Sequence, residues 1–329
     1  MKLSLLLPTH NSAATIERTL SAALAQRHRP LEVVVYDEAS ADDTRAIVRR
    51  LLDAAPDGVD ARLRTAEENS GPVLAWRVAL HDATGDWCTF VWADDVLRHD
   101  FSERMMEAAD RARTAGRKLV TGSGEVEMDG EVRQAYASDT GLLTPQAFSA
   151  GMFFRRYPLT QICATYETAA AREVFDRHVR FDNPLGFDYN RHPYGNDVGY
   201  LSELAAAGGG TERIGEPLVR LTDSETSMTR LATGSHLWQM RWQYTFNQAR
   251  VWRTWEEQGV PGAGRLRAMG VRRLALCTIM LQRDARDLAP RRVARAVGAY
   301  LDFLRFDFQK TRMTLDDFRR RLNANGIPA

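Results

Sequence analysis

The stretch Phe90-Val91-Trp92-Ala93-Asp94-Asp95-Val96-Leu97 is an apolar, strand-like run that ends in two adjacent carboxylates. Hard divalent cations take oxygen ligands, and a protein that uses one to hold a diphosphate needs only one or two carboxylates beside a cleft. An Asp-Asp pair after a strand is also an ordinary turn or helix cap. The meaning of Asp94 and Asp95 therefore depends on the chain that leads to them.

The residues before this pair read as alternating strands and helices. Apolar runs typical of buried parallel strands lie at residues 3–7, where Pro8 breaks the run, at 31–36 and at 87–92, with a shorter strand at 61–65. Residues 16–24, 43–52 and 73–83 have helical periodicity. These predicted helices follow the strands at 3–7, 31–36 and 61–65. We expect Asn11 or Ser12 to cap the first of these helices and Gly85 to cap the third.

This alternation predicts an α/β fold, a mostly parallel sheet flanked by helices on both faces. In such sheets, ligands bind outside the carboxyl ends of the strands. Three polar clusters fall at those ends, namely residues 9–11, the pair Asp37-Glu38 and the pair Asp94-Asp95. One polar cluster at a strand end can easily arise by chance, but three at the same edge of the sheet are much less likely to. We therefore predict a ligand site at this edge.

Length and composition bound the class of protein. The chain has 329 residues, 44% hydrophobic content and a formal net charge of +1, which are ordinary values for a globular protein with one large or two smaller domains. Cys88, Cys163 and Cys277 lie far apart without metal-ligand spacing, so we expect reduced, buried thiols. The early first strand and the lack of an apolar run near the ~20 residues of a membrane span predict a cytoplasmic protein, with the inner face of the membrane as a second location.

The C-terminal part of the chain differs in charge. Residues 251–329 hold 16 Lys and Arg against 8 Asp and Glu, a net +8 that leaves −7 for the rest of the chain. Helices are expected at about 236–258, 265–287 and 290–310, with a short one after Thr314. The first is crowded with aromatic residues, which predict a face packed on the catalytic domain, self-association or contact with a membrane-bound acceptor. These residues are Trp238, Trp242, Tyr244, Phe246, Trp252 and Trp255.

Several motifs, taken together, resemble glycosyltransferase family 2, the inverting GT-A glycosyltransferases. They are the segments 5–11 and 32–44, Asn69-Ser70-Gly71-Pro72, Gly85-Asp86-Trp87 and Ala93-Asp94-Asp95, in the order and at the spacing of that family. The resemblance implies a GT-A catalytic domain over residues 1–230. Residues 1–100 would form its nucleotide-binding half and residues 101–230 its acceptor-binding half. Residues 231–329 would be a helical C-terminal extension.

The resemblance assigns a donor site at the sheet edge. Asp37 would accept a hydrogen bond from the pyrimidine imide, usually of uracil, which suits a group that only accepts. Asp94 would hold the ribose or sugar. Arg77 stands one position from the family's phosphate-facing Arg and would either face the phosphates or only cover a helix surface. Other residues expected to line the nucleotide pocket are Pro8, Thr9, Asn11, Glu38, Ser40 and Asn69.

The same resemblance makes Asp95 the direct ligand of Mn²⁺ or Mg²⁺. Two departures from the family pattern concern this metal. Trp92 stands at the first position of the family's Asp-x-Asp-Asp. Residues 221–227, where many family members have a His, contain none, and Asp223 could replace it. Both departures leave the number of metal ligands open.

Asp197, in the segment Gly195-Asn196-Asp197, resembles the family's acidic dipeptide at a helix start and would be the catalytic base. Inversion requires a base on the face of the sugar opposite the leaving diphosphate, and one partly desolvated carboxylate can take the acceptor's proton. A helix N-cap is the structural alternative for Asp197. Glu203 and Asp188 are further candidates for the base.

The expected function is transfer of a sugar from a nucleotide-diphosphate donor, a UDP-sugar first of all, to a hydroxyl of a glycan or glycolipid acceptor. This is a hexosyl- or N-acetylhexosaminyltransferase reaction of EC class 2.4, in polysaccharide or glycoconjugate biosynthesis. A dehydrogenase or a nucleotidyltransferase would need a glycine-rich turn near the N-terminus, but residues 8–17 contain no glycine. A P-loop enzyme would need a Gly-Lys-Ser/Thr run, which is absent from the sequence. A nucleic-acid partner is not expected, because the basic tail is mixed with acids. A catalytically inactive nucleotide-sugar-binding or scaffold relative is the main alternative.

Overall fold

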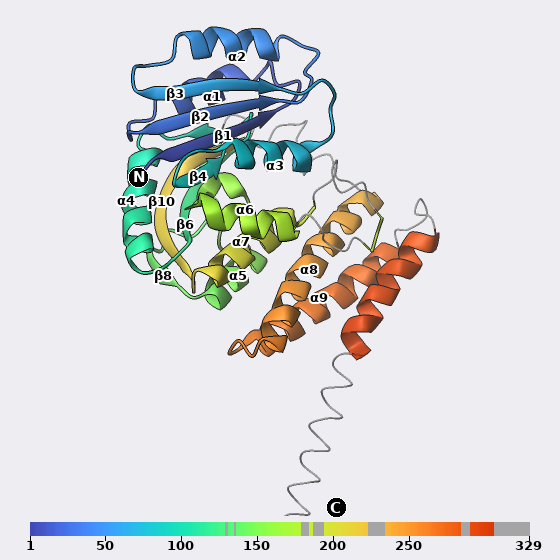
Figure 1. The fold of residues 1–329 in the computed structure, drawn as a ribbon. Coiled ribbons are helices and arrows are strands. Elements are labelled where there is room, and N and C mark those ends of the chain that lie inside the picture. Colours follow the sequence, from blue (N-terminus) through green and yellow to red (C-terminus); the bar gives the residue numbers. More distant parts are fainter. Residues whose placement is uncertain are drawn as a thin grey trace, which may run out of the picture.

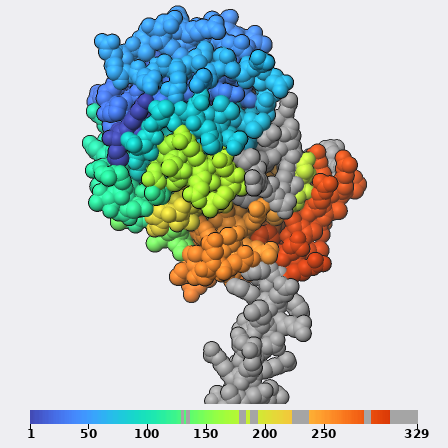
Figure 2. Space-filling model, in the orientation of Figure 1, coloured from blue at the N-terminus to red at the C-terminus, as the bar shows by residue number. Residues whose placement is uncertain are grey.

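The computed structural model describes residues 1–128, 131–134, 136–178, 184–186, 194–222, 234–283 and 290–305. An α/β domain is followed by a lobe of long helices, drawn orange to red in Figures 1 and 2. Helix α8 (Gly234–Glu257) lies between the α/β domain and helix α9 (Ala263–Arg283), and residues 290–305 form a further helix (Figure 1). The proposed domain boundary at residues 230 and 231 and the helix expected after Thr314 lie outside the described residues.

The first half of the domain alternates strands and helices as predicted, within a few residues of the expected bounds. The elements are β1 (Leu3–Thr9), α1 (Ile16–Leu24), β2 (Leu31–Asp37), α2 (Thr44–Asp53), β3 (Val59–Thr65), α3 (Pro72–Asp82), β4 (Trp87–Phe90) and β5 (Val96–Leu97). Strand β1 continues through Pro8, which pairs with Tyr36, so the expected break at Pro8 is wrong. Strand β4 ends at Phe90, earlier than the expected Trp92.

Two predicted helix caps are wrong. The N-cap of α1 is Thr15, and Asn11 instead has φ +48° and accepts a hydrogen bond from the Ala41 amide through Oδ1. The residue after α3 is Ala83 in an extended conformation, so Gly85 does not cap that helix. Gly85 is needed for packing, because a Cβ there would lie 2.5 Å from Ser4 Oγ and 2.9 Å from the Lys2 carbonyl oxygen.

The second half of the domain completes the sheet and adds helices. Its elements are α4 (Phe101–Thr114), β6 (Leu119–Met128), β7 (Glu131–Gln134), β8 (Gly141–Leu143), α5 (Pro145–Phe153), the 3-10 helix η1 (Gln161–Cys163), β9 (Ala164–Glu167), α6 (Thr168–His178), α7 (Asn196–Ala207) and β10 (Thr211–Thr222). The strand order is β3-β2-β1-β4-β9-β6-β10-β5, with β7 on β6 and β8 on β10. Strands β3, β2, β1 and β4 are parallel, whereas β9 runs antiparallel to both of its neighbours.

Alternate side chains of the central strands fill two cores, one on each face of the sheet. Leu5 and Val33 belong to a core with α1 and α4, while Leu6 and Val34 belong to one with α3, α6 and α7. Burial on both faces explains why these strands are continuous apolar runs in the sequence. It also fixes the strand register, which brings the carboxyl ends of β1, β2 and β4 to one edge.

The aromatic residues of α8 divide between two neighbours. Trp242 and Phe246 pack with α9 and the helix 290–305, while Trp252 reaches α5, where its Nε1 donates to Ser149 Oγ at 2.8 Å. Tyr244 packs on the catalytic domain. The predicted packing on the catalytic domain therefore holds for part of this helix. Within the described ranges, no helix is both long and apolar enough to cross a membrane.

Candidate active site

The ends of β1 and β2 and the loops after them form one hydrogen-bonded unit. Thr9 is paired with Asp37 in the sheet register, and the Glu38 amide donates to the Thr9 carbonyl oxygen at 2.9 Å. The two loops join where the Asn11 amide donates to Ser40 Oγ at 2.9 Å. The structure thus brings together the predicted pocket residues Thr9, Asn11, Asp37, Glu38 and Ser40, with Pro8 buried in β1 behind them.

Asp37 is fully buried, yet one of its carboxylate oxygens is unused. Oδ2 accepts from the Ser40 amide at 3.2 Å and from Arg45 Nε. Oδ1 has no hydrogen-bond partner among the described residues, and neither does the buried hydroxyl of Thr9 beside it in register. Unsatisfied buried acceptors are costly and rare. A ligand N–H donor would satisfy Asp37, so the residue fits the role predicted for it.

Glu38 and Asn69 shape the loop that leads into α3. Burial raises the pKa of Glu38, while hydrogen bonds from the backbone of Gly71 and Ser70 act in the opposite direction. Asn69 Oδ1 accepts from the Gly71 amide at 3.0 Å, in a turn where Gly71 has φ +97°. A positive φ favours glycine, and the turn brings exposed Asn69 beside the end of β2.

Asp94 and Asp95 lie where β4 has ended and the chain turns toward β5. Asp95 is 6% exposed, and its Oδ1 accepts from the Thr222 amide at 2.8 Å. Burial first, and then the charge of Asp94, raises the pKa of Asp95 to about 8. Arg18 approaches the pair from α1 and donates to the Asp94 carbonyl oxygen at 2.9 Å. Two adjacent carboxylates are thus held in a setting that opposes their negative charge.

These two carboxylates fit the number that a substrate-bridging divalent cation requires. No group of three or more His, Cys, Asp or Glu side chains with metal-binding geometry occurs among the described residues, so no all-protein metal cage is present there. Mg²⁺ and similar ions bind one or two carboxylates together with substrate phosphates. Burial disfavours the negative charge of Asp94 and Asp95, and a divalent cation would neutralise that charge. Carboxylate oxygens are ligands that suit Mn²⁺ or Mg²⁺.

Trp92 is a structural residue at the position where the family pattern has its first Asp. Its indole Nε1 donates to Thr160 Oγ1 at 2.8 Å, and its ring stacks on Phe90 with an interplanar angle of 8°. The ring also contacts Trp76 of α3 at 5.1 Å between centroids. Trp92 therefore offers no metal ligand and joins the strand end to the segment before η1.

Asp197 is the second residue of α7, after Gly195, which serves as the N-cap in a left-handed conformation. Its side chain is partly exposed, and Oδ1 accepts from Gln161 Nε2 at 2.7 Å. Burial raises its pKa to about 6, and the Gln161 hydrogen bond opposes this shift. Gly195 occupies the capping position, and the Asp197 carboxylate is bound by η1 instead. A carboxylate with a raised pKa and open surface is suited to accept a proton.

The structure does not bring Arg77 into this group of residues. Arg77 is exposed on α3, and its Nε donates to Asp176 of α6 at 2.8 Å. Of the alternative bases, Glu203 lies two turns along α7 from Asp197, whereas Asp188 lies outside the described residues. Asp223, the expected substitute for the missing His, also lies outside them.

Sequence reasoning missed Arg45, Gln161 and Thr222. Arg45 pairs with Asp37, Gln161 with Asp197, and the Thr222 amide with Asp95. The last two contacts join segments 36 and 127 residues apart, so no local spacing could have revealed them. Arg45 is a different case, since it is the second residue of α2, only eight residues after Asp37, and could have been found.

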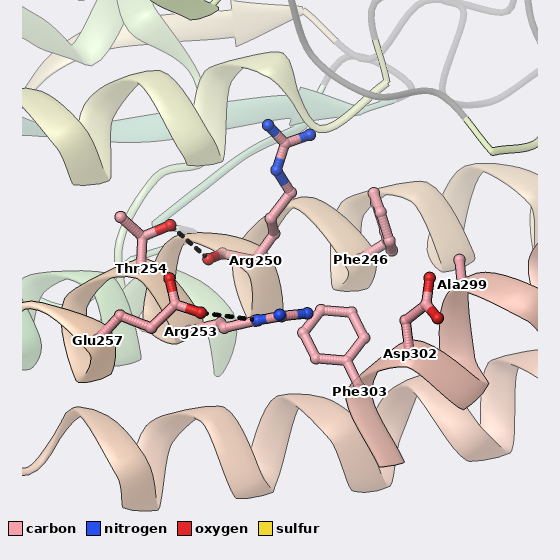
Figure 3. A pocket seen from close by; sticks show the side chains of 8 residues that line it. All are labelled: Phe246, Arg250, Arg253, Thr254, Glu257, Ala299, Asp302 and Phe303. Atoms are coloured by element: carbon pink, nitrogen blue, oxygen red, sulfur yellow. Dashed lines mark hydrogen bonds and ion pairs between the residues drawn. The ribbon is translucent and has the colours of Figure 1, made fainter. Parts of the chain in front are cut away.

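A separate pocket of about 280 Å³ lies in the helical extension, away from the strand ends (Figure 3). It is lined by residues of α8 and of the helix 290–305. Arg253 Nε donates to Glu257 Oε1 at 3.1 Å, and Asp302 adds a further carboxylate to the lining. The two arginines and two carboxylates of the lining balance, so the pocket has no net preference for an anion or a cation.

Comparison with known proteins identifies the family of this chain. The family model Glycosyl transferase family 2 matches residues 4–178, more than half of the chain, and the chain belongs to this family. Its fold is of the GT-A type. The succinoglycan biosynthesis protein ExoO of Rhizobium meliloti is 29% identical over 205 residues, covering 61% of this chain and 54% of that protein. The Campylobacter jejuni GalNAc(5)-diNAcBac-PP-undecaprenol beta-1,3-glucosyltransferase is 27% identical over 139 residues, covering 41% and 42%. The chain therefore spans about half the length of these relatives.

Solved structures show the same fold at low identity. TarS residues 1–349 of S. aureus in complex with UDP superimpose with a TM-score of 0.58 and 19% identity, over 84% of this chain and 70% of that one. The mannosyltransferase PcManGT of Pyrobaculum calidifontis, in complex with GDP-Man and Mn²⁺, gives a TM-score of 0.51 at 18% identity, over 98% and 87%. The second match extends over the helical lobe as well.

Proposed function

We propose that this chain is an inverting, metal-dependent glycosyltransferase that moves a sugar from a UDP-sugar to a hydroxyl of a glycan or glycolipid acceptor. The observation that carries the proposal is a line of contacts from the carboxylate pair to Asp197. Trp92, two residues before Asp94, bonds to Thr160, and the next residue, Gln161, bonds to Asp197. Inverting transfer requires a site for the leaving diphosphate and a base. Asp94 and Asp95, at one end of this line, would provide the first, and Asp197, at the other end, would provide the second.

The donor would lie across the carboxyl ends of β1, β2 and β4. Asp37 Oδ1 would accept the imide N–H of uracil, and Asn11, Ser40 and Asn69 would border the nucleotide. Asp94 would hold the ribose or sugar. Mn²⁺ or Mg²⁺, bound by Asp95 and the diphosphate oxygens, would neutralise charge that develops on the leaving group. The known UDP and Mn²⁺ complexes of GT-A proteins support these choices.

Asp197 would take the proton of the acceptor hydroxyl as the sugar–oxygen bond forms. Its pKa of about 6 leaves it mostly ionised at neutral pH and still basic enough to act. Gln161 holds one oxygen of Asp197, and the other oxygen would take the proton of the acceptor. Relatives named for transfer to diphosphate-linked undecaprenol glycans support a glycolipid acceptor and a role in polysaccharide or glycoconjugate assembly.

The helical lobe would bring the protein to the membrane face where such acceptors lie. Helix α9 contains no Asp or Glu, and its exposed side chains include those of Arg265, Arg272, Arg283, Leu276 and Ile279. Basic and apolar side chains on one helix face favour an anionic lipid surface. Self-association through the same helices is the competing interpretation, and light scattering with and without anionic vesicles separates the two.

A transfer assay tests the whole proposal. Incubation with UDP-sugars, Mn²⁺ and a panel of lipid-linked and free glycans should release UDP faster with an acceptor than without one. An inactive relative that only binds nucleotide sugars is the alternative, since Trp92 departs from the family pattern. If UDP binds but neither transfer nor hydrolysis occurs with any donor, the inactive alternative is correct.

A further inference from the structure

Helix α8 has two different buried faces. Trp242, Phe246 and Ala249 form an apolar face that packs with α9. Asn247 and Gln248 are also fully buried, although both side chains are amides. A buried amide is costly unless it forms hydrogen bonds, so the partners of these two residues show what the polar face holds.

Asn247 contacts the residues that lead into α7. Its Nδ2 donates to the Tyr194 carbonyl oxygen at 3.3 Å, and its Oδ1 accepts from Gln243 Nε2, one turn earlier in α8, at 2.9 Å. Both ends of the amide group have a partner, which fixes the orientation of the side chain. Tyr194 directly precedes Gly195, the N-cap of α7, and Asp197 is the second residue of that helix.

Gly195 shows how closely α8 approaches the start of α7. Its φ of +77° favours glycine, and a Cβ there would lie 2.9 Å from both Asn247 Nδ2 and the Tyr244 Cα, closer than normal van der Waals contact. The start of α7 is therefore held from two directions. Gln161 of η1 binds Asp197 Oδ1 at 2.7 Å, and Asn247 of α8 binds the residue before the cap.

A second polar contact joins α8 to the α/β domain one turn and more along α7. Gln248 Nε2 donates to Ser149 Oγ of α5 and, at 3.4 Å, to Ser202 Oγ of α7. The two serine hydroxyls lie 3.0 Å apart. Ser202 comes five residues after Asp197 in the sequence. Of these two polar contacts of α8, that of Asn247 adjoins the candidate base and that of Gln248 does not.

We propose that Asn247 is a positioning residue for the transfer reaction, which holds the start of α7 so that Asp197 lies where it takes the acceptor proton. This inference rests on the proposed function, because it takes Asp197 as the base. The helical lobe is then part of the catalytic site. Buried hydrogen bonds fix two segments more narrowly than apolar packing does, because a small displacement leaves polar groups unpaired. Displacement of a catalytic group by about 1 Å can lower the rate on the order of a hundredfold.

Steady-state kinetics of Asn247→Leu test the catalytic effect. Leucine is similar in size but cannot donate to the Tyr194 carbonyl oxygen. Release of UDP from UDP-glucose and UDP-GlcNAc is measured with Mn²⁺ and the glycans of the transfer assay. We expect kcat to fall on the order of tenfold, while the KM for the sugar nucleotide and the affinity for UDP–Mn²⁺ stay unchanged. Asn247→Ala is the second variant if the leucine variant fails to fold.

Gln248→Leu is the matched control. It removes a buried amide from the same helix and the same interface, so it should destabilise the protein as Asn247→Leu does. Its contacts lie at Ser149 and Ser202, and kcat should therefore stay that of the parent.

Hydrogen exchange followed by mass spectrometry tests the positioning without any transferase activity. In Asn247→Leu, the amides of residues 195–200 should exchange faster than in the parent, because the start of α7 opens more often. In Gln248→Leu, faster exchange should instead appear at residues 201–206.

The outcomes separate this inference from the proposed function. A lower kcat at unchanged KM, with faster exchange at residues 195–200, supports it. Equal losses of kcat in Asn247→Leu and Gln248→Leu overturn it, because both residues would then act only through the stability of the lobe. Unchanged exchange at residues 195–200 in the Asn247 variants also overturns it. If the parent releases UDP from neither sugar nucleotide, the proposed function fails, and faster exchange in Asn247→Leu still supports the hold on the start of α7.

Discussion

At the scale of single residues, Asp37 shows how a carboxylate is prepared for a ligand. Its Oδ2 is fixed by Arg45 and the Ser40 amide, so the side chain cannot turn away, while Oδ1 stays without a partner among the described residues. The fold has to bear the cost of one unsatisfied buried acceptor. A nucleobase N–H would remove that cost, so the proposed binding of a nucleotide should depend on this atom.

Replacement of Asp37 by Ala should therefore weaken UDP binding by about 1–3 kcal/mol, as expected for the loss of a hydrogen bond to a charged group. The loss should be larger for uridine than for adenosine nucleotides. Isothermal titration measures it. Asp43→Ala is the control, because Asp43 is an exposed carboxylate at the start of α2 whose side chain makes no capping hydrogen bond. Unchanged UDP affinity would make Asp37 a purely structural residue.

Asp197→Asn should lower kcat by roughly a hundredfold or more while leaving donor binding nearly intact, because a general base contributes about that factor. The amide keeps the size of the side chain, and its oxygen can still accept from Gln161. Steady-state kinetics and UDP titration measure the two effects separately. A variant that keeps most of its rate would assign the proton to another carboxylate, of which Glu203 is on the same helix.

The raised pKa of Asp197 also predicts a pH dependence of stability. Its pKa rises from the usual 3.8 to about 6, so between these values the native protein binds a proton that the unfolded chain does not. Stability from this group is therefore present at low pH and lost as pH rises through about 6. Asp197→Asn does not titrate, so its melting temperature should rise relative to the parent between pH 4 and pH 7. The difference corresponds to about 2–3 kcal/mol.

At the scale of elements, the sequence predicts those strands and helices whose burial leaves a regular pattern of apolar residues. Strands β1, β2 and β4 are buried on both faces, so their apolar runs identified them and placed Asp37, Asp94 and Asp95 at one edge. The end of a strand is less predictable, because Pro8 can pair within β1 when its neighbour supplies the hydrogen bonds. The hydrogen bond from the Thr222 amide of β10 to Asp95 could not be predicted, because it joins residues that are far apart in the sequence.

Gly85 tests the packing between β1 and the loop after α3. Gly85→Ala should destabilise the protein by about 1–3 kcal/mol, because the added methyl would meet Ser4 and the Lys2 backbone. Gly298→Ala is the control, since nothing lies within 4 Å of a Cβ there and the residue is helical. That control should be neutral or stabilising by up to ~1 kcal/mol. Chemical denaturation measures both, and equal stability of the two variants would contradict the packing.

At the scale of the whole molecule, the chain combines an α/β domain with a lobe of long helices (Figure 1). The sheet edge holds the residues proposed to bind nucleotide and metal, while α8 covers the start of α7, where a Cβ at Gly195 would lie 2.9 Å from the Tyr244 Cα. Residues 251–329 hold the excess positive charge, whose function the sequence alone left open. In the structure, part of this charge lies on α9, where Arg265, Arg272 and Arg283 are exposed, and no local motif could reveal that arrangement.

The central claim is that Asp95 and a divalent cation hold the donor diphosphate, and thermal unfolding tests it most directly. A ligand that binds only the folded state raises the melting temperature by mass action. UDP with Mn²⁺ or Mg²⁺ should stabilise the parent protein more than UDP alone, and Asp95→Ala should lose the metal-dependent part of that increase. The control Arg113→Gln, which changes an exposed arginine of α4 paired with Asp110, should keep it. If UDP and metal together stabilise Asp95→Ala as much as the parent, Asp95 is not the metal ligand and the account of the donor site is wrong.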